Sequence, residues 1–111
     1  MDFKLVEEED LAEPEIKTFE VSTRTTGPWN RADVEWKVFH EDGALEEVKS
    51  ELIVLDDEGE VKEVLDTETT SISGESASGE DNLRMRGDAD AVRLTVTDTA
   101  GQETSKTEQI E

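Results

Sequence analysis

The chain has 111 residues, and its 31 acidic and 11 basic side chains give a formal net charge of −20 at pH 7. A chain of this length normally forms one domain. The basic residues are scattered singly, which disfavours nucleic acid and anionic membrane surfaces as partners, because both attract clustered Lys and Arg. The chain has no cysteine, which excludes disulfides, thiol nucleophiles and thiolate metal sites. No apolar run approaches the roughly 20 residues of a membrane span, so we expect no membrane insertion.

The acidic side chains are spread between well-patterned apolar positions and are not gathered into one tail. Like charges at this density repel one another and disfavour a compact chain in dilute buffer. In molar salt the Debye length falls to about 3 Å, and most of this repulsion is screened. We therefore expect a folded domain from an extreme halophile, with a haloarchaeon as the expected source. The alternative is an ordinary acidic protein of a mesophile.

Residues 1–13 are expected to form an acidic leader, either flexible or docked as an extra edge strand. Residues 14–111 are predicted to form one β-sandwich, because runs with apolar side chains at every second position alternate with turn signals. The clearest such run contains Val34, Trp36 and Val38, and Trp36 is expected in the core. Ile16 falls out of phase with its neighbours, which indicates a β-bulge or a position on an edge strand. Strands are predicted at residues 15–23, 32–40, 45–55, 61–73, 82–86, 91–98 and 102–110, with a flexible loop at 74–81.

Seven strands at a spacing near ten residues favour an all-β fold, an immunoglobulin-like Greek-key β-sandwich. Residues 15–19 and 34–43 resemble the start of a PKD-like or other immunoglobulin-like module. Residues 92–101 resemble its penultimate strand and turn, and residues 71–79 are similar to loops of such modules in haloarchaeal surface and secreted proteins. The resemblance implies a spacer, a stalk or a protein-binding unit without catalytic residues.

Few side chains suggest a chemical site. His40 is the only histidine, but no nucleophile motif accompanies it, so we expect it to mark the end of a strand. Asp88, Asp90 and Asp98 are the best candidates for calcium ligands, provided that both loops beside the strand 91–98 lie at one end of the sandwich. No other cofactor is expected.

Two aromatic residues are candidates for binding a protein partner. Trp29 follows Pro28 in a polar loop, where its side chain is expected to be either exposed or folded over a sheet edge. Phe39 is out of phase with Trp36 and is expected on the outer surface. Exposed aromatic side chains often anchor interfaces. The tripeptide at residues 86–88 spells the integrin-recognition motif, but Gly87 is explained by turn geometry alone.

These features together predict a non-catalytic halophilic module that acts as a structural spacer or a protein–protein binding domain. The alternatives are a small stand-alone intracellular or virus-associated protein that binds a partner, and a calcium- or carbohydrate-binding module. The compartment follows from the context of the chain. A module from a longer chain would be extracellular or at the cell surface, and a chain with Met1 as its native start would be cytoplasmic.

Overall fold

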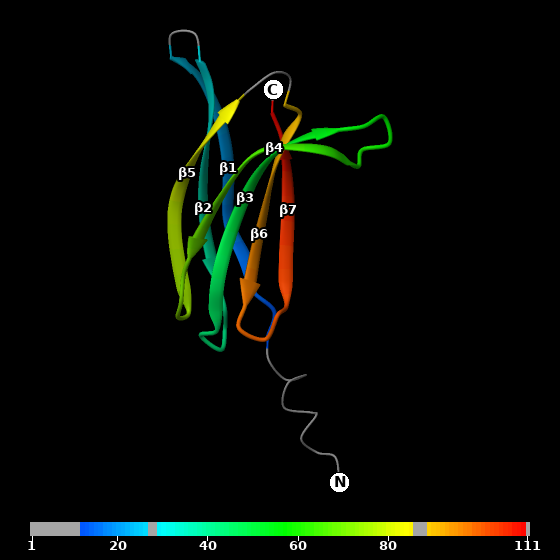
Figure 1. Ribbon diagram of the computed structural model, residues 1–111. Coiled ribbons are helices and arrows are strands. Elements are labelled where there is room, and N and C mark those ends of the chain that lie inside the picture. The colour runs from blue at the N-terminus through cyan, green and yellow to red at the C-terminus, as the bar shows by residue number, and fades with distance from the viewer. Residues whose placement is uncertain (1–11, 27–28, 86–88, 111) are drawn as a thin grey trace.

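The computed structural model describes residues 12–26, 29–85 and 89–110, with side chains described except at residues 24–26, 29–30 and 85. Within these ranges every regular element is a β-strand, and the strands form two antiparallel sheets that pack face to face (Figure 1). The predicted all-β sandwich of seven strands is therefore confirmed. The strands are β1 (Glu15–Thr26), β2 (Trp29–Phe39), β3 (Leu45–Leu55), β4 (Val61–Ser71), β5 (Ser76–Met85), β6 (Ala91–Asp98) and β7 (Glu103–Gln109).

One sheet has three strands in the order β1-β2-β5, and the other has four in the order β4-β3-β6-β7. The chain crosses between the sheets from β2 to β3, from β4 to β5 and from β5 to β6. These crossings place β3 beside β6 and β2 beside β5, so that strands distant in sequence become neighbours. This connectivity is that of an immunoglobulin-like Greek-key sandwich.

The core lies between the two sheets and is built from the alternating side chains that the sequence pattern indicated. In β2 the inward residues Val34, Trp36 and Val38 are all at most 2% exposed. Burying a side chain of this size stabilises the fold by about 1.5–3 kcal/mol. The prediction that Trp36 belongs to the core is confirmed. The other sheet contributes mainly Leu45, Val48, Leu52, Val92, Leu94 and Val96.

The flexible loop predicted at residues 74–81 is wrong, because residues 76–81 form the first half of β5 and pair with β2. Gly79 lies opposite Trp36, and a Cβ at position 79 would come within 2.7 Å of Trp36 Cζ2. Asp81 points inward and accepts hydrogen bonds in the core. Glycine and aspartate are common turn residues, but here a buried tryptophan requires both of them inside a strand.

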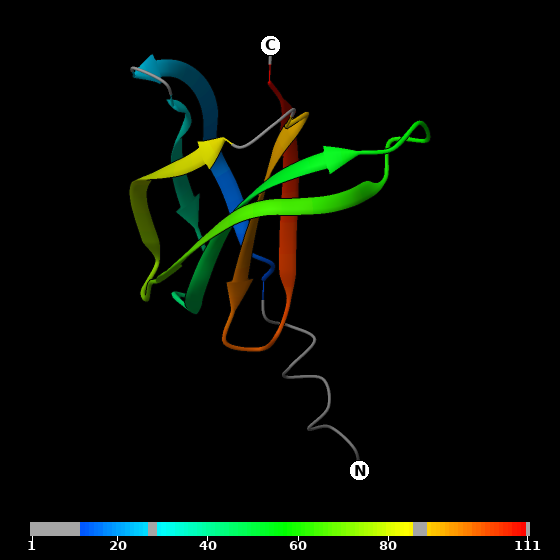
Figure 2. The same cartoon turned by 45° about the horizontal axis from the view of Figure 1, so that its top comes forward.

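The two hairpins that begin the sheets also differ from expectation. The loop predicted after the first strand is shorter, since β1 continues to Thr26 and pairs there with Trp29. The bulge predicted at Ile16 is confirmed by a shift in register between Ile16 and Thr18. In β4 the pairing with β3 skips Leu65 and again Lys62. Bulges increase strand twist, and the end of the β3–β4 hairpin projects from the sandwich (Figure 2).

Candidate functional site

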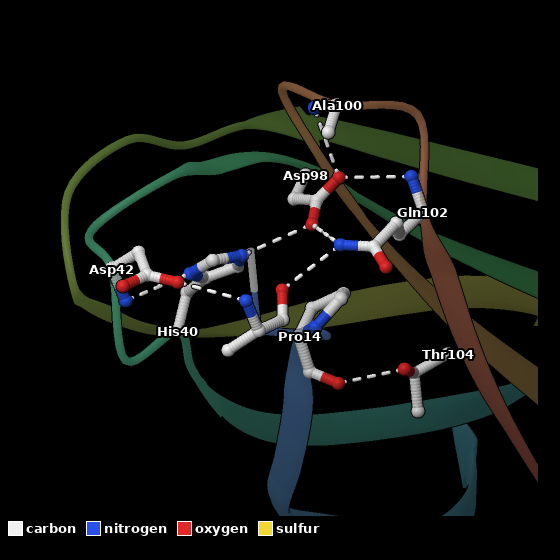
Figure 3. Close-up of polar contacts among 8 residues, drawn as sticks. Pro14, His40, Asp42, Asp98, Ala100, Gln102 and Thr104 are labelled. Atoms are coloured by element: carbon white, nitrogen blue, oxygen red, sulfur yellow. Dashed lines mark hydrogen bonds and ion pairs between the residues drawn. The ribbon is translucent and has the colours of Figure 1, made fainter. Parts of the chain in front are cut away.

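The most polar part of the interior lies at the end of the sandwich where β2 and β6 finish, which we call the His40 end (Figure 3). His40 follows the last residue of β2, and Asp98 is the last residue of β6. Both side chains are fully buried, and His40 Nε2 lies 3.0 Å from Asp98 Oδ2. The position of His40 agrees with its expected place at the end of a strand.

The hydrogen bonds around the ring define its tautomer. The backbone N–H of Asp42 donates to His40 Nδ1 at 3.1 Å, so Nδ1 carries no hydrogen. The hydrogen on Nε2 is therefore donated to Asp98 Oδ2. Both ring nitrogens are occupied by partners within the fold.

The carboxylate of Asp98 accepts four hydrogen bonds. Its Oδ1 accepts the backbone N–H groups of Ala100 and Gln102, at 3.0 and 2.8 Å. Its Oδ2 accepts from His40 Nε2 and from Gln102 Nε2, the latter at 2.8 Å. Burial raises the pKa of Asp98, but the hydrogen bonds from Gln102, His40 and Ala100 outweigh this effect and lower it below the ordinary value.

The same cluster fixes the segment that precedes β1. Gln102 Nε2 donates to the carbonyl oxygen of Ala12 at 2.9 Å, and Ala12 N donates to Asp42 Oδ2 at 2.8 Å. Thr104 Oγ1 donates to the carbonyl oxygen of Pro14 at 2.6 Å. The cluster thus joins the chain before β1 to the ends of β2 and β6. Its hydrogen-bonding capacity is used to hold the fold together, which favours a structural role over proton transfer.

A second buried carboxylate links the two sheets in the middle of the core. Asp81 of β5 is 4% exposed, and its Oδ2 accepts from Ser50 Oγ of β3 at 2.6 Å and from Trp36 Nε1 of β2 at 3.1 Å. Buried carboxylates are tolerated only when donors compensate for the lost hydration. The Ser50–Asp81 bond therefore ties the four-stranded sheet to the three-stranded one.

The candidate calcium ligands do not come together. Asp90 precedes β6 and Asp98 ends it, so eight residues of extended chain, about 26 Å, separate them. Asp90 Oδ2 instead accepts the backbone N–H of Leu55 at 2.8 Å. Asp88 lies outside the described residues. Among the residues that the structure does describe, no group of three or more His, Asp or Glu side chains is arranged to hold a metal ion.

Of the two candidate aromatic anchors, Phe39 points away from the core, as its phase indicated, and is half-buried. The ammonium of Lys17 lies 5.3 Å from the centroid of its ring, and this cation–π contact covers part of the ring. The backbone of Trp29 begins β2, but its side chain lies outside the described part of the structure. A binding role for these two residues stays a prediction.

An apolar surface that sequence reasoning missed lies on the projecting β3–β4 hairpin. Val61 and Val64 are 38% and 41% exposed, and they pair with Leu55 and Ile53 of β3. Cross-strand partners share a face of the sheet, so the four side chains form one group, which we call the hairpin patch. The spacing of three between Val61 and Val64, which breaks the period of two, is the signal that could have revealed it.

Comparison with known protein families finds no match to this sequence, and comparison with curated proteins finds no significant relative. Across residues 12–26, 29–85 and 89–110, the structure contains no helix long and apolar enough to span a membrane.

Proposed function

We propose that this chain is a non-catalytic immunoglobulin-like module, adapted to high salt, that acts as a structural spacer or protein-binding domain. The proposal draws on the resemblance of residues 15–19, 34–43 and 92–101 to PKD-like or other immunoglobulin-like modules, and of residues 71–79 to loops of such modules in haloarchaeal surface and secreted proteins. A place at the cell surface follows from that likeness and belongs to the proposal.

The observation that carries the proposal is the path of the chain through the sandwich. Ala12 is bonded to Gln102 and Asp42 at the His40 end. Ile110 donates its backbone N–H to the carbonyl oxygen of Asp90, at the opposite end of β6. Figure 1 shows β7 leaving the sandwich at the end opposite to the β6–β7 turn. Because the chain enters at one end of the sandwich and reaches Ile110 at the other, the domain adds its own length to an extended chain.

The internal chemistry supports a structural role for the buried polar groups. His40 and Asp98 are hydrogen-bonded to each other and to neighbouring amide groups. Asp81 accepts hydrogen bonds from Ser50 and Trp36. Among the residues that the structure describes, most carboxylates are not buried, which suits a domain whose carboxylates are screened by concentrated salt.

A tandem protein tests the spacer function. Two copies of residues 12–110 would be joined by a short Gly-Ser linker and measured by small-angle X-ray scattering in 2–3 M KCl. At this salt concentration the Debye length is below about 3 Å. We expect a maximum dimension close to twice that of a single copy. A tandem that folds back, with a dimension near that of one copy, would contradict the spacer function.

A further inference from the structure

The hairpin patch lies outside the cluster of side chains that fills the space between the sheets, since none of its members, Ile53, Leu55, Val61 and Val64, belongs to that cluster. Ile53 is only 1% exposed although it faces outward, while Val61 and Val64 are more than a third exposed. In the described part of the chain, these two valines are the large apolar side chains that are most exposed.

The patch forms one wall of an open groove on the outer face of the four-stranded sheet. Ile53, Leu55 and Val61 line the groove on the hairpin side, with Gly59 and Glu60 at its tip, and the opposite wall is formed by Arg93, Thr107 and Gln109. Figure 2 shows the end of the hairpin projecting beyond the other strands. An apolar surface rimmed by polar groups is typical of a site that binds another molecule.

The charge around the groove indicates the kind of partner. The turn at the tip of the hairpin carries four exposed carboxylates, at Asp56, Asp57, Glu58 and Glu60. Hydrogen bonds from the backbone N–H groups of Glu60 and Glu58 hold the pKa of Asp56 below its ordinary value, so this group stays charged well into the acid range.

Among the described residues that line the groove, Arg93 is the one cation, and it adds little positive charge. Arg93 Nη2 lies 2.8 Å from Glu51 Oε1, and Arg93 Nε donates to the same oxygen at 2.9 Å. With Arg93 paired in this way, and with the single charge of Lys62 acting on Asp56, the four carboxylates leave the tip with a net negative charge. A second copy of the chain has 31 acidic and only 11 basic side chains, so it offers these carboxylates few cationic partners at any salt concentration.

We propose that the hairpin groove binds a cationic segment of another protein, with apolar side chains against the hairpin patch and Lys or Arg beside the acidic tip. This inference rests on the protein-binding half of the proposed function and names its surface and the chemistry of its partner. The apolar contacts supply affinity that survives in salt, and the carboxylates select a basic sequence.

The test uses three synthetic peptides that differ in one property each. The probe KKSLSLSKK joins leucines to lysines, EESLSLSEE reverses its charge, and KKSSSSSKK removes its apolar side chains. Each peptide is added stepwise to the protein, and binding is measured from the changes in the backbone amide chemical shifts. The titration uses the lowest salt concentration at which the domain is fully folded. We expect only KKSLSLSKK to bind, with shifts concentrated in residues 53–64 and 107–109.

Two double variants locate the contacts. Val61→Ser with Val64→Ser and, separately, Glu58→Lys with Glu60→Lys should each weaken KKSLSLSKK binding about tenfold. Glu20→Lys with Glu35→Lys is the matched control, because these carboxylates are exposed on the other sheet, and it should bind as the unchanged protein does. All substitutions are on the surface, and urea unfolding verifies that each variant is folded.

The proposal fails if KKSLSLSKK does not bind, if its shifts fall on the β1–β2 face, or if the valine variant binds as tightly as the unchanged chain. It also fails if sedimentation shows self-association that the valine variant abolishes, because the occupant would then be a second copy. An elongated tandem with no peptide binding would reject this inference alone. A folded-back tandem with peptide binding would reject the spacer function alone.

Discussion

Replacing Asp98 with asparagine should remove a large part of the stability of the domain. Oδ1 and Oδ2 of Asp98 each accept two hydrogen bonds, so every partner of the carboxylate is a donor. Asparagine has the same shape, but in either orientation its NH₂ group faces two donors. Losing two hydrogen bonds to a buried charged group costs about 3–6 kcal/mol, at about 1.5–3 kcal/mol each. A domain of this size has a total stability of about 5–15 kcal/mol.

The free energy of unfolding is measured by urea titration in molar salt, followed by tryptophan fluorescence. Asp42→Asn is the matched control, because Asp42 is exposed and its carboxylate accepts the backbone N–H of Ala12. We expect the control to lose about 1 kcal/mol or less. A loss below about 1 kcal/mol for Asp98→Asn would refute the view that the four hydrogen bonds stabilise the fold.

The pH dependence of stability gives a second readout of the same carboxylate. The pKa of Asp98 is lowered in the folded state, so its contribution is present above the unfolded pKa of about 3.9 and is lost as pH falls through the folded value. The unchanged protein should therefore lose stability below about pH 4 more steeply than Asp98→Asn does. If both proteins lose the same free energy of unfolding as the pH falls, the pKa of Asp98 is not lowered in the folded state.

Three further outcomes are expected. Gly79→Ala should destabilise the fold by about 1–3 kcal/mol in urea unfolding, because the new methyl group would overlap Trp36. An unchanged urea midpoint would mean that the indole ring of Trp36 moves aside without cost. Ser50→Ala should cost about 1–3 kcal/mol by leaving Asp81 with one fewer donor, and a smaller loss would exclude a link between the sheets. The melting temperature should rise between dilute buffer and molar KCl, and equal stability in both would reject the halophilic adaptation.

The sequence pattern predicted most of the fold because the strands that form the core alternate cleanly. Val34, Trp36 and Val38 point inward as their spacing indicates, and the bulge at Ile16 follows from one residue out of phase. The pattern failed at residues 76–81, where Gly79 and Asp81 indicated a loop. Both residues are there because of Trp36, which lies on another strand. Such pairwise requirements across a sheet are invisible in a local pattern.

The candidate sites were harder to predict, for two physical reasons. Asp90 and Asp98 were grouped as ligands on the condition that their loops share one end of the sandwich, and an extended β6 holds them apart. The hairpin patch depends on register, because bulges at Leu65 and Lys62 decide which side chains of β4 oppose Ile53 and Leu55. Composition alone gives neither register nor distance.

The path of the chain also determines how the domain would respond to a pulling force. Pro14, just before β1, is bonded to Thr104 near the start of β7. Figure 1 shows both strands running from there toward the other end of the sandwich, so they run in the same direction. A force applied at Ala12 and Ile110 would therefore act along the β1–β2 and β6–β7 ladders. Hydrogen bonds in antiparallel ladders are perpendicular to the strands, so such a load shears many of them together and does not open them one at a time. The topology thus gives this small, highly charged domain a mechanically resistant geometry.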